Sequence, residues 1–182
     1  MKSSLLSLTL LITIASFAQP MYMTRNGQIS FYSKTPMENI DAVNNEVTAM
    51  INSSTGELAF AVLIKSFRFE RALMEEHFNE NYMESDKFPK ATFSGKITNP
   101  GNVNFNTNGN YPVSVEGELT IHGVKKSITS TGTINISGSK VTTLSTFLVR
   151  LADYNISIPA LVADKISETV EVKVNCEYQP KK

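Results

Sequence analysis

The chain is poor in the residues that build reactive or metal-binding sites. Among its 182 residues it has one cysteine, two histidines and no tryptophan. The single cysteine, Cys176, excludes an internal disulfide. His77 and His122 lie far apart, and neither has a second histidine or a cysteine at the spacing of a zinc site. There is no glycine-rich phosphate loop and no nucleophile elbow. These absences predict a protein that is not an enzyme and uses no metal or other cofactor.

The chain also lacks an excess of either charge and lacks long apolar runs. It carries 17 basic and 17 acidic residues, with no extended basic stretch. Nucleic acid requires a positive surface, so we expect no nucleic-acid partner. The longest apolar stretch, residues 5–14, is about half of the roughly 20 residues that a membrane-spanning helix needs. We therefore expect no transmembrane anchor.

The first 18 residues have the three parts of a secretory signal. Lys2 supplies the positive start, the apolar stretch follows, and Ser16-Phe17-Ala18 offers small residues for a signal peptidase. This pattern predicts a signal peptide over residues 1–18 and one domain over residues 19–182. We expect the mature protein to be periplasmic or secreted.

Most of the remaining chain alternates between apolar and polar residues, which is typical of strands with one face inward and one face toward water. Gly and Asn turn signals separate the alternating stretches. About eight short strands joined by tight turns indicate an all-β antiparallel barrel or a β-sandwich. The predicted strands cover residues 29–31, 43–51, 58–64, 91–97, 113–121, 127–136, 141–149 and 169–178.

One stretch departs from this alternation. Residues 70–81 contain strong helix formers and no Gly or Pro, with Leu73, Met74, His77 and Phe78 at helical spacing. This predicts one short amphipathic helix inserted between strands. Its apolar stripe either packs against the barrel wall or covers the mouth of the barrel.

Large apolar side chains gather in the middle of the chain, which is the composition either of a ligand pocket or of a filled core. The continuous apolar run at 58–64 leaves the strand phase of Phe60 and Val62 open. Cys176 continues an alternating row of valines, which predicts a buried thiol rather than a reactive one. The inward strand phase assigns to the interior Phe31, Phe60, Val62, Phe93, Val115, Leu119, Phe147 and Val172. The helix stripe adds Leu73, Met74 and Phe78 near one mouth of the barrel, and Phe67 and Phe69 lead into that mouth. We expect these thirteen residues to line the ligand site.

Three motifs in order carry a resemblance to a known family. Residues 86–93 read D-K-F-P-K-A-T-F, residues 117–126 read G-E-L-T-I-H-G-V-K-K, and residues 147–156 read F-L-V-R-L-A-D-Y-N-I. Over residues 24–178 the chain resembles the YceI-like family. Lys125 stands where that family usually has Thr, Asn155 stands where it has Gly, and the first strand lacks the family's usual His.

The resemblance implies an eight-stranded, lipocalin-like barrel with one inserted helix. It also implies binding or carriage of an amphiphilic isoprenoid lipid, such as a quinone or a polyprenyl phosphate, without catalysis. Two alternatives stay open: binding of another lipid, such as a fatty acid or fatty amide, and a stress-linked structural barrel whose interior is filled. The sequence leaves the oligomeric state open, a homodimer included.

Overall fold

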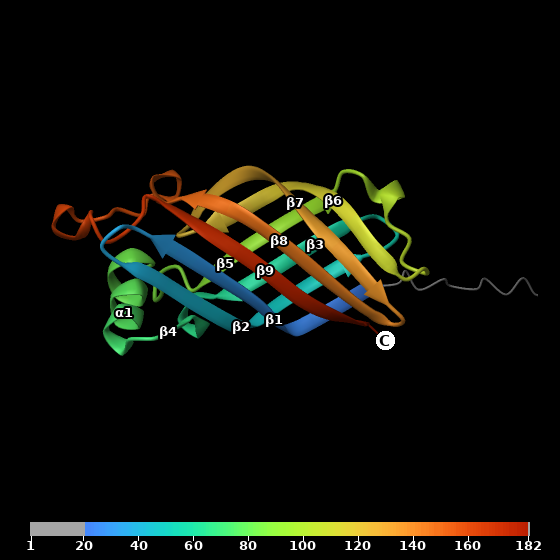
Figure 1. Ribbon diagram of the computed structural model, residues 1–182, viewed down its shortest axis with the longest axis horizontal. Coiled ribbons are helices and arrows are strands. Elements are labelled where there is room, and N and C mark those ends of the chain that lie inside the picture. Colours follow the sequence, from blue (N-terminus) through green and yellow to red (C-terminus); the bar gives the residue numbers. More distant parts are fainter. Residues whose placement is uncertain (1–20, 182) are drawn as a thin grey trace, which may run out of the picture.

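A computed structural model describes residues 21–181, so the predicted signal at residues 1–18 lies outside the described part. Within that part, eight long strands form a closed antiparallel barrel (Figure 1). Around the barrel the strands follow the order β1-β9-β8-β7-β6-β5-β3-β2, and β2 pairs again with β1. The long strands are β1 (Met21–Lys34), β2 (Asn39–Asn52), β3 (Glu57–Leu63), β5 (Lys90–Ile97), β6 (Gly109–Ile121), β7 (Val124–Ser137), β8 (Lys140–Arg150) and β9 (Thr169–Pro180). The predicted lipocalin-like barrel is confirmed, and the sandwich is excluded.

The tight turns expected from the sequence join neighbouring strands. β6 and β7 are connected by His122 and Gly123, with φ angles of 50° and 74°. Two successive positive φ values define the hairpin turn whose twist matches the right-handed twist of the strands. A side chain at position 123 would also meet the Phe88 ring, because an added Cβ would lie 2.5 Å from that ring. Glycine is therefore required there for two reasons.

The inserted helix is shorter than predicted. α1 spans Ala72–His77 and continues into a π-helical turn, η2, over Phe78–Tyr82. The backbone N–H of Met83 donates to the Phe78 carbonyl five residues earlier, at 2.9 Å. Helix propensity alone predicts a regular helix to residue 81, and the packing of Phe78 and Tyr82 against the barrel interior overrides it. A two-residue strand, β4 (Arg68–Phe69), pairs with β2 and is too short to show alternation in the sequence.

The connections contain four short 3-10 turns, which the sequence did not predict. They are η1 (Ile64–Ser66), η3 (Pro100–Asn102), η4 (Leu151–Tyr154) and η5 (Ala160–Val162). The last two lie in the long connection between β8 and β9. In Figure 1 this connection, the β1–β2 turn and α1 all stand at the same end of the barrel. We call this end the mouth.

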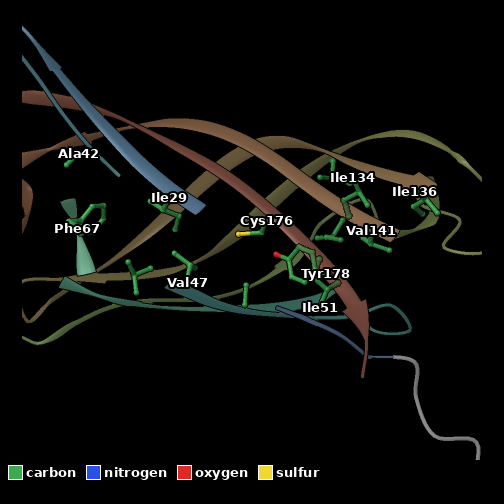
Figure 2. Packing of buried hydrophobic residues seen from close by; sticks show 14 residues of the cluster. Ile29, Ala42, Val47, Ile51, Phe67, Ile134, Ile136, Val141, Cys176 and Tyr178 are labelled. Atoms are coloured by element: carbon green, nitrogen blue, oxygen red, sulfur yellow. The ribbon is translucent and has the colours of Figure 1, made fainter. Parts of the chain in front are cut away.

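Two clusters of buried side chains form the core. One extends along the barrel, from Ala42 and Phe67 on the mouth side to Ile51 and Tyr178 toward the other end (Figure 2). The other lies nearer the mouth and joins Leu119, Val149 and Val170 to residues of the connecting segments. Cys176 belongs to the first cluster and is fully buried, as predicted. Burial raises the pKa of its thiol to about 11.

Two glycines face each other across β5 and β6. Gly95 pairs with Gly117, and a Cβ added to Gly117 would lie 2.5 Å from the Ser94 carbonyl oxygen and 2.6 Å from the Phe93 ring. Side chains at these positions would force the strands apart or move the ring. Glycine at position 117 therefore leaves room for β5 and for the Phe93 ring.

Candidate ligand-binding cavity

The mouth end of the barrel encloses an apolar cavity of about 290 Å³, which we call the outer cavity. Its wall comes from the barrel strands, its roof from α1 and η2, and one side from the β8–β9 connection. Glu38, His77, Tyr82 and Lys165 are its charged or titratable lining residues and come from these mouth segments. The rest of the wall is almost wholly apolar and includes Ile29, Phe31, Val62, Ile64, Phe67, Met83, Leu119, Phe147, Val149, Ile156, Val170 and Val172.

A second cavity of about 120 Å³, the inner cavity, lies farther from the mouth. It is lined by Phe60, Phe93, Val115 and residues of β7, β8 and β9. Tyr178 lies in its wall, and burial raises the pKa of this phenol far above its usual range. The two cavities share five lining residues and therefore adjoin along the barrel. The shared residues are Ile29, Val62, Ala91, Leu119 and Phe147.

Four phenylalanines form one side of the outer cavity. The Phe31 ring centroid lies 5.4 Å from that of Phe67, 5.8 Å from that of Phe69 and 5.4 Å from that of Phe78. These distances are typical of favourable aromatic pairs. Phe31 belongs to β1, and the other three rings belong to residues 67–78. The cluster therefore attaches β4 and the α1–η2 segment to the barrel wall.

The polar groups of the outer cavity differ in whether they have partners. Ser33 is buried, and its hydroxyl accepts the backbone N–H of Ser167 at 2.9 Å. Glu38 forms an ion pair with Arg71 across the mouth. The side chains of His77 and Lys165 make no hydrogen bond or ion pair with another residue in the range 21–181. A ligand with a polar head would meet these two groups at the mouth and apolar walls below them.

Twelve of the thirteen residues assigned to the interior by sequence line one of the two cavities. The outer cavity takes Phe31, Val62, Phe67, Phe69, Met74, Phe78, Leu119, Phe147 and Val172, and the inner cavity takes Phe60, Phe93 and Val115. The inward phase of Phe60 and Val62, open from sequence, is thereby settled. Whether these side chains contact a ligand stays a prediction.

The placement of Leu73 in the interior is wrong. Its side chain is 60% exposed and lines neither cavity. Met74 and Phe78 are four residues apart, so they share one face and point inward. Leu73 lies about 100° from Met74 around the helix axis, which turns it toward solvent. The helix is too short for its apolar stripe to wrap inward on both sides.

Sequence reasoning missed the contribution of the β8–β9 connection. Its lining residues are Leu151, Ile156, Val162, Lys165 and Ile166. These residues follow neither the strand period nor the helix period, so periodicity could not assign them a face. The available signal was the recurrence of apolar residues through an otherwise polar connection.

His122 holds together three segments beside the outer cavity. One ring nitrogen contacts the Tyr154 carbonyl oxygen at 3.1 Å, and the other contacts a Glu84 carboxylate oxygen at 3.0 Å. Glu84, His122 and Asn155 are the non-glycine residues with positive φ in the range 21–181, so all three unusual backbone positions meet here. Both contacted oxygens are acceptors, so the ring donates to both only as an imidazolium. Hydrogen bonding to His122, and then to Lys87, lowers the pKa of Glu84.

The segments joined by His122 contribute residues to the wall of the outer cavity. Met83 precedes Glu84, and Ile156 follows Asn155; both line the outer cavity. Asn155 has a φ of 56° and ends η4, in the left-handed conformation that Asn tolerates better than most residues. This explains how Asn can stand where the resembling family has Gly.

Three further observations on the described residues concern metal binding, membrane-spanning helices and a third hollow. No group of three or more His, Cys, Asp or Glu side chains in the range 21–181 is arranged to hold a metal ion. None of the helices described there is long and apolar enough to cross a membrane. A larger depression of about 730 Å³ lies over β3, β5 and β6, but it is open and its lining includes Lys96, Glu116 and Glu118. It does not suit an apolar ligand.

Solved structures share this fold at low sequence identity. A polyisoprenoid-binding domain from Saccharophagus degradans is similar with a TM-score of 0.77 and 17% identity, over 88% of this chain and 98% of that domain. BcnA from Burkholderia cenocepacia is similar with a TM-score of 0.69 and 16% identity, over 84% of this chain and 95% of BcnA. A YceI protein from Campylobacter jejuni gives a TM-score of 0.57 and 16% identity, over 100% of this chain and 99% of that protein.

The comparison with curated proteins gives no match. The model of the YceI-like domain matches residues 22–178, which include every strand of the barrel except the last residues of β9 and the first of β1. The chain belongs to the YceI-like family.

Proposed function

We propose that the protein binds an amphiphilic isoprenoid lipid inside the barrel and carries it without chemical change. One observation carries this proposal: two adjoining apolar cavities run inward from a mouth that holds unpaired polar side chains. Such a shape suits a molecule with one polar end and a long apolar tail. The name of the similar domain from Saccharophagus degradans, which describes polyisoprenoid binding, supports the same ligand class.

The physical driving force is removal of the tail from water. Burial of each CH₂ group contributes about 0.8 kcal/mol, so a chain of three isoprene units gains on the order of 10 kcal/mol before the costs of ordering. The phenylalanine cluster and the aliphatic wall supply this burial with rigid side chains. No reaction step is needed for binding or release.

Two alternatives make different demands on the interior. A fatty acid or fatty amide would use the same walls, and branching of the tail is what distinguishes it from an isoprenoid. A structural barrel with a filled interior would have no room for either. The outer cavity of about 290 Å³ is near the lower end of the roughly 300–1,000 Å³ typical of ligand pockets, which favours a carrier.

Organic extraction of the purified protein, followed by mass spectrometry, tests the proposal. We expect a prenyl-chain lipid at a substantial fraction of one molecule per protein, absent from an unrelated protein purified in parallel. A straight-chain fatty acid in its place would support the first alternative. Protein that contains no lipid and takes up no added prenol would support the filled barrel.

A further inference from the structure

Three large apolar side chains stand exposed around the mouth. Met37 is 66% exposed, Leu73 is 60% exposed and Leu161 is 91% exposed. They come from three separate segments: the β1–β2 turn, α1 and η5. Each directly precedes a residue that lines the outer cavity, namely Glu38, Met74 and Val162 respectively. The three side chains therefore form an apolar rim on the mouth, and we call them the rim residues.

Polar groups also lie at the mouth, beside the rim residues. The ion pair of Glu38 with Arg71 and the side chains of His77 and Lys165 all lie at the mouth. A protein partner is usually bound through a continuous apolar centre surrounded by a polar edge. Isolated apolar side chains mixed with charged ones instead suit a membrane interface, where each side chain enters the acyl region and the charges stay among the headgroups.

We propose that the rim residues dock the mouth of the barrel on a lipid bilayer, so that the ligand passes between bilayer and outer cavity without crossing water. This inference rests on the proposed function for the identity of the cargo. Exposure of each further methylene to water slows escape by about fourfold, so release of a prenyl chain into solution would be extremely slow. Docking of the mouth removes that barrier, because the tail moves from one apolar phase directly into another.

The outer wall of the barrel provides a matched control. Leu148 is 69% exposed and lies on β8. It lines neither cavity and alternates with inward Phe147 and Val149. It has the same chemistry as the rim leucines but belongs to the wall rather than the mouth.

The experiment compares wild type, the triple variant Met37→Ser/Leu73→Ser/Leu161→Ser and the control Leu148→Ser. Flotation of ligand-free protein with phosphatidylcholine vesicles measures docking. We expect the triple variant to lose on the order of tenfold or more in vesicle partitioning, and the control to stay within about twofold of wild type. Equal partitioning of wild type and the triple variant, or an equal loss in the control, would overturn the proposal.

A second measurement separates docking from ligand binding. A pyrene-labelled farnesyl chain is added from ethanol, and its uptake by each protein is measured by fluorescence; its transfer to vesicles is then timed. We expect equal uptake by all three proteins and transfer at least several-fold slower from the triple variant. Failure of all three to take up the label would count against isoprenoid binding, while the flotation result would still decide whether the rim docks.

Discussion

Val115 lies in the wall of the inner cavity, where it pairs with Ile97 on β5. Replacement by phenylalanine adds bulk inside a closed ring of strands, at a cost of about 1–3 kcal/mol in the free energy of unfolding. We expect Val115→Phe to stay folded and to retain less long-chain lipid, because its ring occupies the inner cavity. Lipid extraction with mass spectrometry, beside circular dichroism of the same sample, measures both effects. A folded variant with a full complement of lipid would remove the inner cavity from the binding site.

A charge at the same position should have a different result. Val115→Asp places an unpaired carboxylate against apolar walls, and such burial costs several kcal/mol. We expect a large drop in the urea midpoint of unfolding or failure to fold. Leu148→Asp, at a 69% exposed position of β8, is the control and should cost much less. Similar midpoints for the two variants would show that position 115 does not face a dry interior.

The thiol of Cys176 should be unreactive in the native protein. It is fully buried, and burial raises its pKa to about 11, so the reactive thiolate is scarce at pH 8. We expect Ellman's reagent to label native protein slowly and to label one thiol per chain after unfolding in urea. Rapid labelling of the native state would mean that β9 opens readily or that Cys176 is accessible.

At the scale of elements, the contact between Glu84 and His122 joins the β6–β7 hairpin to the wall of the outer cavity. The pKa of Glu84 is lowered from its ordinary value of 4.5, chiefly by hydrogen bonding to His122. A lowered pKa in the folded state stabilises the protein above the unfolded pKa, and this contribution is lost as the pH falls through the folded value. We expect Glu84→Gln to destabilise at pH 6, with the difference from wild type shrinking below pH 4.5.

Urea unfolding at a series of pH values from 6 to 3 measures this effect. Glu80→Gln is the control, because Glu80 makes no hydrogen bond or ion pair with another residue in the range 21–181. Its difference from wild type should be small at every pH. If Glu84→Gln shows the same flat profile, the contact with His122 contributes nothing to stability.

The elements also differ in how well the sequence predicted them. The alternation from β5 to β9 fixed both the strands and their inward faces, because one wet face and one dry face impose a period of two. The α1–η2 segment was predicted as helical, but its regular part is shorter than predicted, since π-helical hydrogen bonds follow the α-helical ones after His77. The β8–β9 connection has no period, so its share of the cavity wall was not predictable from local pattern.

The volume of the cavities was beyond sequence reasoning for a related reason. An open barrel interior and a filled one contain the same residue types. Which of the two forms depends on where a few aromatic rings lie. Phe93 shows this: its ring occupies space that side chains would fill at Gly95 and Gly117. The sequence contains both glycines, but only their pairing across β5 and β6 shows that they make room for the Phe93 ring.

At the scale of the whole molecule, we propose that the protein is exported and acts in the periplasm or outside the cell. The pattern at residues 1–18 motivates this, and those residues lie outside the described part of the chain. N-terminal sequencing of protein from the envelope fraction should begin at or near Gln19. Protein found in the cytoplasm with Met1 retained would contradict export.

The seam of the barrel joins the two ends of the described chain. β1 pairs with β9, and the backbone N–H of Lys181 donates to the Met21 carbonyl at 2.7 Å. Contacts this distant in sequence carry a large loop-closure cost and make folding slow. A chain still missing β9 leaves the edges of β1 and β8 unpaired and the apolar lining open to water. The interior therefore closes only after β9 has been added to the barrel, and cargo can be loaded only after that step.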